Sequence, residues 1–133
     1  MKFLLDTNVC IQWMNGEEAL RSRAVAIGSQ CLFITNSILA ELFYGAFKSG
    51  RIDTNLARVE IFVQGLNVIG DSQESARIFG RIKADLRKAG KPTQDFDLLI
   101  ASVALASDCT LVTGNQKHFE AIPGLRLENW QSA

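Results

Sequence analysis

Short apolar runs alternate with longer amphipathic stretches along the chain. The runs are continuously apolar, as in strands buried on both faces of a parallel sheet, whereas a half-exposed strand would alternate apolar and polar residues. The longer stretches repeat apolar residues at helical spacing and are bounded by capping residues and glycines. The predicted strands are 3–5, 31–34, 66–69, 110–113 and an edge strand at 125–127, and the predicted helices are 17–27, 38–47, 53–64, 72–89 and 97–106.

This alternation predicts the α/β class, and within it a three-layer α/β/α sandwich with a mostly parallel sheet. We expect a single domain over 1–133, with a composition (47% hydrophobic, 21% charged) that excludes disorder. No apolar run approaches the ~18 residues of a membrane span, and the N-terminus does not have the pattern of a signal peptide. The three cysteines are widely spaced, which predicts reduced thiols and a cytoplasmic location.

Fourteen basic and fourteen acidic residues give a net charge of zero. This balance argues against a protein that coats nucleic acid by bulk charge, although a local basic strip suffices for a nuclease. His118 is the only histidine, which excludes zinc sites built from several histidines, and we interpret it as a structural or surface residue. Phosphate-binding glycine motifs are absent from the sequence, so nucleotide cofactors are not expected.

Three carboxylates occur at the ends of, or inside, otherwise apolar elements. Asp6 directly follows the first predicted strand, and ligands of parallel sheets bind outside the carboxyl ends of strands. Glu41 lies within the apolar helix 38–47, where an unpaired buried carboxylate would cost several kcal/mol. Asp97 begins the apolar helix 97–106. If the three converge, their repulsion is relieved by a hard cation, Mg²⁺ or Mn²⁺, and such sites most often act on phosphate esters.

Each of these acids also has a purely structural explanation. Asp6 is placed to cap the helix that follows it. Glu41 fits a narrow solvent-facing stripe beside Ser37 or Lys48. Asp97 is favoured by the dipole in the first turn of its helix, with Asp95 as the N-cap.

Two further groups of residues support a phosphodiester substrate. A basic stripe runs from helix 72–89 into the segment that carries Asp95 and Asp97, and the alternative for it is a solvated helix face. Hydroxyls and amides at strand ends are placed to position water or hold carboxylates, and each is also a candidate cap. The stripe comprises Arg77, Arg81, Lys83, Arg87, Lys88 and Lys91, and the strand-end residues are Thr7, Asn8, Ser37, Thr113 and Asn115.

Taken together and in this order, the motifs resemble a PIN-domain ribonuclease of the VapC toxin type over essentially the whole chain. Each piece is weak alone, and the set is specific. The matching pieces are FLLDTN at 3–8, AEL and YG at 40–45, GKP at 90–92, DLLIA at 97–101, VT with Asn115 and Phe119 at 112–119, and GL with Trp130 at 124–130.

The resemblance implies a metal-dependent endoribonuclease that is the toxin of a toxin–antitoxin pair and cleaves structured RNA such as tRNA or rRNA. It places the family's acids on Asp6, Glu41 and Asp97, with Mg²⁺ or Mn²⁺ held by Asp6 and Asp97 and by Glu41 directly or through water. Asn115 stands where the family commonly has a fourth acid, and Asp95 is the candidate to compensate for it. Asp97 or Glu41 would orient or deprotonate the attacking water. A homodimer, a neutralising VapB-type antitoxin and a larger complex of the two are implied as partners.

Two rival functions remain open at the level of sequence. A Mg²⁺-dependent phosphatase of the haloacid-dehalogenase kind also has an Asp after its first strand. It needs a second Asp two residues later, where this chain has Asn8. A catalytically weak PIN-like domain that binds RNA or protein is the other alternative.

Overall fold

The computed structural model describes residues 1–131, so the last two residues of the predicted domain lie outside the described chain. Its sheet has the strand order β3-β2-β1-β4-β5, and every neighbouring pair is parallel. The prediction of a parallel sheet in the α/β class is therefore confirmed. The strands are β1 (Lys2–Leu5), β2 (Leu32–Thr35), β3 (Asn67–Ile69), β4 (Cys109–Val112) and β5 (Leu127–Glu128).

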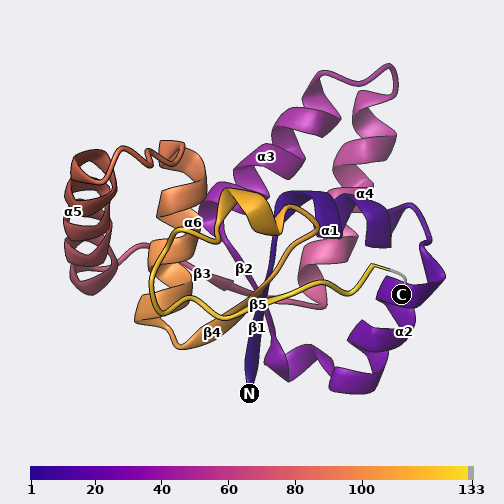
Figure 1. The fold of residues 1–133 in the computed structure, drawn as a ribbon. Coiled ribbons are helices and arrows are strands. Elements are labelled where there is room, and N and C mark those ends of the chain that lie inside the picture. The colour runs from indigo at the N-terminus through magenta and orange to yellow at the C-terminus, as the bar shows by residue number, and fades with distance from the viewer. Residues whose placement is uncertain (132–133) are drawn as a thin grey trace.

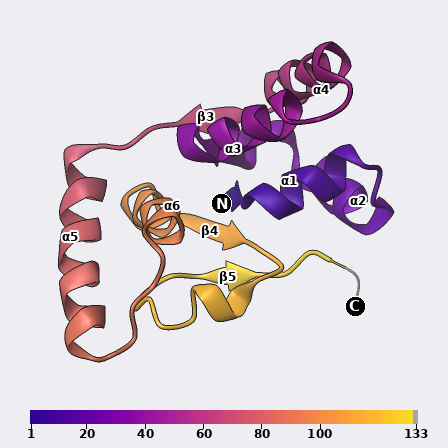
Figure 2. The same ribbon diagram turned by 90° about the horizontal axis from the view of Figure 1, so that it is seen from above.

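Helices connect successive strands and cover the sheet. The five predicted helices have observed ends within two residues of those expected, with side-chain caps at the starts of α3 and α5. The short helix α1 was not among the predicted helices, although Thr7 and Asn8 were recognised as residues that can start one. In Figure 1, α5 and α6 lie on one side of the molecule and α1, α2 and α4 on the other, and Figure 2 shows α5 outside α6. The helices are α1 (Thr7–Met14), α2 (Glu18–Ile27), α3 (Asn36–Phe47), α4 (Ile52–Gln64), α5 (Gln73–Lys88) and α6 (Asp95–Ala106), with 3₁₀ turns at Ser29–Cys31 and Gln116–His118.

The strand order reverses between β1 and β4. From β1 the chain adds β2 and then β3 on one side, and after α5 and α6 it adds β4 on the other side of β1. The register pairs Leu5 with Val112 at the carboxyl ends of these two strands, and the Asp6 backbone N–H donates to the Val112 carbonyl at 2.9 Å. The residues that follow β1 and β4 therefore meet at the switch point, where parallel sheets bind their ligands.

The helices α6 and α3 are both apolar in sequence, but they are buried to different extents. In α6 six residues between Leu98 and Ala104 are buried, as its apolar sequence predicts. In α3 only Ile38, Leu42 and Ala46 are buried, and Phe47 is 60% exposed. The prediction that α3 is buried on nearly all sides is therefore wrong, because α1, α4 and β2 cover one face of it and leave the other open.

Among residues 1–131, none of the helices is long and apolar enough to cross a membrane.

Candidate active site

Asp6 is held at the switch point by hydrogen bonds to both carboxylate oxygens. One oxygen accepts from the Thr7 backbone N–H at 2.8 Å, so Asp6 is the N-cap of α1, as its structural explanation requires. The other accepts from the Thr113 hydroxyl at 2.8 Å, and that hydroxyl accepts in turn from the Asn115 backbone N–H at 3.0 Å. The side chain is only 8% exposed. Capping and a functional role are compatible here, because the bond from Thr113 fixes the carboxylate across the β1–β4 boundary.

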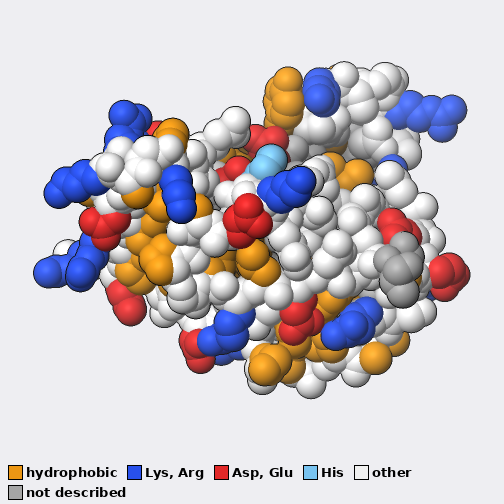
Figure 3. Space-filling model, in the orientation of Figure 1, with side chains coloured by type: hydrophobic (Ala, Val, Ile, Leu, Met, Phe, Trp, Pro, Cys, Tyr) orange, Lys and Arg blue, Asp and Glu red, His pale blue; other side chains and the backbone are white. Residues whose placement is uncertain are grey.

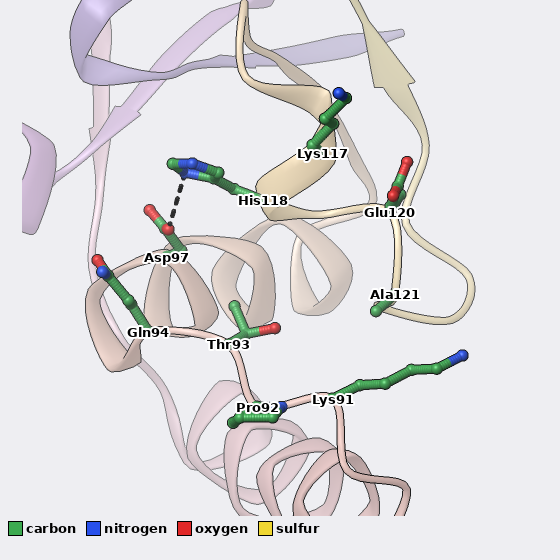
Figure 4. A pocket seen from close by; sticks show the side chains of 9 residues that line it. All are labelled: Lys91, Pro92, Thr93, Gln94, Asp97, Lys117, His118, Glu120 and Ala121. Atoms are coloured by element: carbon green, nitrogen blue, oxygen red, sulfur yellow. Dashed lines mark ion pairs between the residues drawn. The ribbon is translucent and has the colours of Figure 1, made fainter.

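Asp97 faces the same region from the first turn of α6. Its side chain is 18% exposed, and one of its oxygens lies 3.4 Å from Nδ1 of His118. Burial raises the pKa of Asp97, the negative charge of Asp6 raises it further, and His118 opposes both effects. Asp6 and Asp97 therefore lie close enough for their charges to repel one another. Figure 4 shows His118 directed at Asp97 across the cleft between α6 and the 3₁₀ turn.

Glu41 does not lie in an apolar interior. Its side chain is exposed on α3, as the solvent-facing alternative describes, and it lines a groove of about 230 Å³ together with Ile11, Met14 and Arg58. The predicted burial of this carboxylate is therefore wrong. Within residues 1–131, the side chains of His, Cys, Asp and Glu form no group of three or more that could hold a metal ion. The geometry brings together the pair Asp6 and Asp97.

Asp95 is engaged on the other side of α6. Its carboxylate lies 3.0 Å from the Lys83 ammonium group of α5, and its side chain is 62% exposed. Gln94 is the N-cap of α6, so the prediction that Asp95 caps this helix is wrong. With its charge paired to Lys83, Asp95 is poorly placed to compensate for Asn115.

The basic stripe lies on α5 and on the loop after it. Figure 3 shows Lys and Arg side chains gathered at the α5 end of the molecule. Arg81 pairs loosely with Asp85 at 4.0 Å, and Lys83 pairs with Asp95. Lys91 lines the same cleft as Asp97, so the stripe does reach the acids. The exposed members besides Lys91 are Arg77, Arg81, Arg87 and Lys88.

The cleft around Asp97 contains residues that the sequence did not single out. It has a volume of about 520 Å³, and Lys117, His118 and Glu120 line it opposite α6. Figure 4 places the side chains of Lys117 and Lys91 at opposite ends of the residues that line it. Their place in the chain could have indicated this role, because the segment after β4 must lie beside Asp6 if β4 is the neighbour of β1. His118 is a surface residue, as predicted, and it also contacts a candidate catalytic carboxylate.

The smaller polar residues divide into structural and site residues. Ser37 exchanges a hydrogen bond with the Thr35 hydroxyl at 2.9 Å, and Thr35 caps α3, so both residues have a local role. Thr113 holds Asp6, as predicted for these side chains. The Thr7 hydroxyl is buried and has no hydrogen-bond partner among residues 1–131. An unsatisfied polar atom next to Asp6 indicates that a water or an ion completes this site.

These observations test whether a divalent cation fits. The donors at the switch point are oxygen atoms, the charges of the two carboxylates repel each other, and the buried hydroxyl of Thr7, the residue after Asp6, lacks a partner among residues 1–131. Mg²⁺ and Mn²⁺ prefer oxygen ligands, and Mg²⁺ retains several waters, so two carboxylates are enough to bind it. The residues present therefore fit such an ion.

Comparisons with known proteins all point to the same family. The model of the PIN domain matches residues 3–125. The chain is 36% identical over 130 residues to the tRNA(fMet)-specific endonuclease VapC of Shigella flexneri and 39% identical over 131 residues to that of Salmonella typhimurium, with 98% of each chain covered. It is 36% identical over 132 residues to ribonuclease VapC2 of Rickettsia felis, again with 98% of each chain covered.

Solved structures agree with this result. DNA-bound VapBC from Salmonella typhimurium superimposes with a TM-score of 0.91 at 38% identity and covers 98% of each chain. VapBC2 from Rickettsia felis, bound to a DNA fragment from its promoter, gives a TM-score of 0.90 at 34% identity, covering 98% of this chain and 99% of the other.

Proposed function

The chain belongs to the PIN-domain family as a VapC-type ribonuclease toxin, and from this premise we propose that it cleaves structured RNA by cation-assisted hydrolysis centred on Asp6 and Asp97. The observation that carries the proposal is that Asp6, at the carboxyl end of β1, and Asp97, in the first turn of α6, lie near each other beside a cleft flanked by lysines. Carboxylates supply the cation and water chemistry, while lysines attract the phosphate backbone.

Asp6 and Asp97 would hold the divalent cation, Mg²⁺ or Mn²⁺. Such a cation, when bound, supplies Lewis acidity toward a phosphodiester oxygen and acidifies water. Glu41 lies in the groove between α1, α3 and α4, so its direct or water-mediated contribution depends on a side-chain conformation other than the exposed one. We therefore assign it a subordinate role in binding the ion.

The protein's own groups prepare the reaction in three ways. Thr113 and the Thr7 backbone N–H hold the Asp6 carboxylate in one orientation. Asp97 faces the cleft from the first turn of α6, where it orients or deprotonates the attacking water. His118 lies against Asp97 and restricts its side chain, while Lys91 and Lys117 bind phosphates on either side of the cleaved bond. This geometry favours Asp97 over Glu41 as the group that acts on water.

Cleavage of a synthetic tRNA-like hairpin tests this proposal directly. With EDTA we expect no cleavage, and addition of Mg²⁺ or Mn²⁺ restores it, whereas Ca²⁺ serves as a control for general screening of charge. Equal cleavage with EDTA and with Mg²⁺ would overturn the proposal of a cation-dependent reaction. Transfer RNA is the first substrate to examine, because two of the similar proteins are named as tRNA(fMet)-specific endonucleases.

We propose further that a VapB-type antitoxin binds this toxin, as in the VapBC complexes to which it is similar. The groove of about 230 Å³ between α1, α3 and α4 and the exposed apolar side chains near it, such as Phe47 and Ile52, suit an amphipathic antitoxin helix. The uncovered face of α3 also supports the homodimer, because contiguous exposed apolar residues usually mark interfaces.

A further inference from the structure

A pocket lined by uncharged side-chain amides lies next to the carboxylates. It has a volume of about 240 Å³, and its polar lining consists of Asn8, Gln12, Asn115 and Gln131. Ile11 and Gly114 complete the wall, so no charged residue contributes to it. This lining differs from the cleft around Asp97, where Lys91 and Lys117 supply positive charge.

The amide pocket is joined to the site through shared residues. Asn8 follows Asp6 by two positions in the first turn of α1, and Asn115 follows Thr113, whose hydroxyl holds Asp6. A third hollow of about 500 Å³ shares Gly114 and Asn115 with the amide pocket and His118 with the cleft around Asp97. The three hollows are therefore linked through Asn115 and His118, which gives an RNA strand with a phosphate at Asp97 a route to the amide pocket.

Two of the four amides come from distant parts of the chain and contact each other. Gln12 of α1 and Gln131 near the C-terminus hydrogen-bond to each other through their side chains. The Gln131 backbone N–H donates to the Asn129 side chain at 2.9 Å, which orders this segment. Gly114 lies directly against the Gln131 side-chain amide, so the wall of the pocket is close-packed at this point.

Amides suit nucleobases better than they suit phosphates. An Asn or Gln side chain carries a donor and an acceptor side by side, which matches the paired donors and acceptors on base edges. Gln131 donates to the Gln12 side-chain oxygen, so the Gln12 amide nitrogen and the Gln131 side-chain oxygen face a base as donor and acceptor. Sequence-specific RNA recognition acts mostly on unpaired bases that can leave the stack and expose these edges. A pocket of this size accommodates one planar base. Because the pocket has no positive charge, it does not attract the phosphate groups of the backbone.

We propose that Asn8, Gln12, Asn115 and Gln131 form a subsite that binds one unpaired nucleobase beside the cleaved phosphate and sets the sequence preference of the ribonuclease. The subsite rests on the proposed function for its substrate, since it assumes that RNA lies across Asp97. It goes beyond that function by assigning base selection to amides rather than to the basic residues of α5.

The test uses a pool of RNA hairpins with a randomised loop, cleaved by the full-length protein with Mn²⁺, and the cut ends are sequenced. The variants Gln12→Leu and Gln131→Leu keep side-chain volume and remove the amide. We expect the ratio between the best and worst base at one position next to the cut to fall about tenfold, within the range of one paired amide–base contact. Gln64→Leu, an exposed glutamine at the end of α4, is the matched control and keeps the wild-type ratio.

A second variant at Gln12 avoids placing an apolar side chain in the polar pocket. Gln12→Glu keeps the shape but exchanges the amide donor for an acceptor, so the preferred base should change to one with an exocyclic amino group. The subsite is overturned if the wild type has no base preference next to the cut. It is equally overturned if both Gln12 variants and Gln131→Leu rank the four bases as Gln64→Leu does.

Binding separates failure of the subsite from failure of the proposed function. RNAs from the same pool are captured on the immobilised protein and sequenced without cleavage. If the wild type cuts no RNA with Mg²⁺ or Mn²⁺, the proposed function fails, and the base preference among captured RNAs then decides the subsite by the same comparison of variants.

Discussion

At the scale of single residues, the site depends on two carboxylates that differ in how they are held. Asp6 receives two hydrogen bonds and is nearly buried, whereas Asp97 has one long contact with His118 and a pKa raised by burial and by Asp6. A raised pKa means that folding disfavours the ionised form, so Asp97 lowers stability at a pH above its usual pKa. The ionised carboxylate of Asp97 therefore lowers the stability of the fold, as is common for residues of functional sites.

Asp6→Asn and Asp97→Asn should each abolish RNA cleavage, because both changes are nearly isosteric and remove a cation ligand. Asp97→Asn should also hold or raise the thermal midpoint in EDTA at pH 7, since the disfavoured charge is gone. The two readouts are cleavage of a structured RNA and thermal unfolding followed by circular dichroism. Asp85→Asn on the exposed side of α5 is the matched control, and cleavage at the wild-type rate by either site variant would show that the assignment is wrong.

Thr113→Val should lower kcat while leaving KM for RNA little changed, because the hydroxyl positions Asp6 without touching the substrate. Loss of a hydrogen bond to a charged group costs about 1.5–3 kcal/mol, so stability should also fall by roughly that amount. Thr113→Ser should restore both kcat and stability, since it keeps the donor. A purely structural role would lower stability and leave kcat intact, and Thr110→Val, at a buried threonine within β4, provides that comparison.

At the scale of elements, the sequence predicted the five strands and the helices α2 to α6, because many of their ends are set locally, and it missed the short helix α1. Thr35 caps α3 and Ser72 caps α5 through bonds within a few residues, so the boundaries were visible in the chain itself. The exposure of Glu41 was not visible, because it depends on which elements cover α3. The contribution of His118 was missed for the same reason, since its contact with Asp97 joins residues that only the strand order brings together.

The charge of α5 should govern RNA affinity more than the chemical step. Arg81→Glu combined with Arg87→Glu should weaken binding and flatten its dependence on salt, because fewer counterions are released. Single-turnover cleavage at saturating RNA should change much less. Arg21→Glu combined with Arg51→Glu makes the same change of charge on other exposed positions and should leave the salt dependence alone. If both double variants weaken RNA binding equally, the basic residues of α5 form an ordinary solvated helix face.

The open face of α3 should control self-association. Phe47 is 60% exposed, whereas Phe43 is partly buried against the core, so Phe47→Glu is the cleaner change. We expect it to shift a dimer toward monomer in light scattering while the thermal midpoint stays close to that of the wild type. Val25→Glu on α2, at 69% exposure, is the matched control. A wild type that is monomeric throughout the micromolar range would contradict the dimer.

At the scale of the whole molecule, binding of a divalent cation should increase the stability of the fold. On the proposed function, Mn²⁺ binds the assembled carboxylates in preference to the unfolded chain, so it should raise the thermal midpoint. At a concentration one hundred times the dissociation constant the gain is about 2.7 kcal/mol. The shift should disappear in the double variant Asp6→Asn with Asp97→Asn, and an identical shift there would mean that ions act on the protein without using this site.

The placement of α5 has a consequence for how the molecule approaches RNA. The net charge is zero, so the total charge gives no attraction at long range. The basic residues of α5 lie at one end, however, and Figure 3 shows Lys and Arg side chains gathered there with some acidic side chains among them. Helix α5 carries five basic and two acidic residues, so this end has a local positive excess, which turns toward a polyanion before the two touch. At physiological salt the field fades within about 8 Å, so RNA would orient the toxin during the last step of approach and present the cleft rather than a random face.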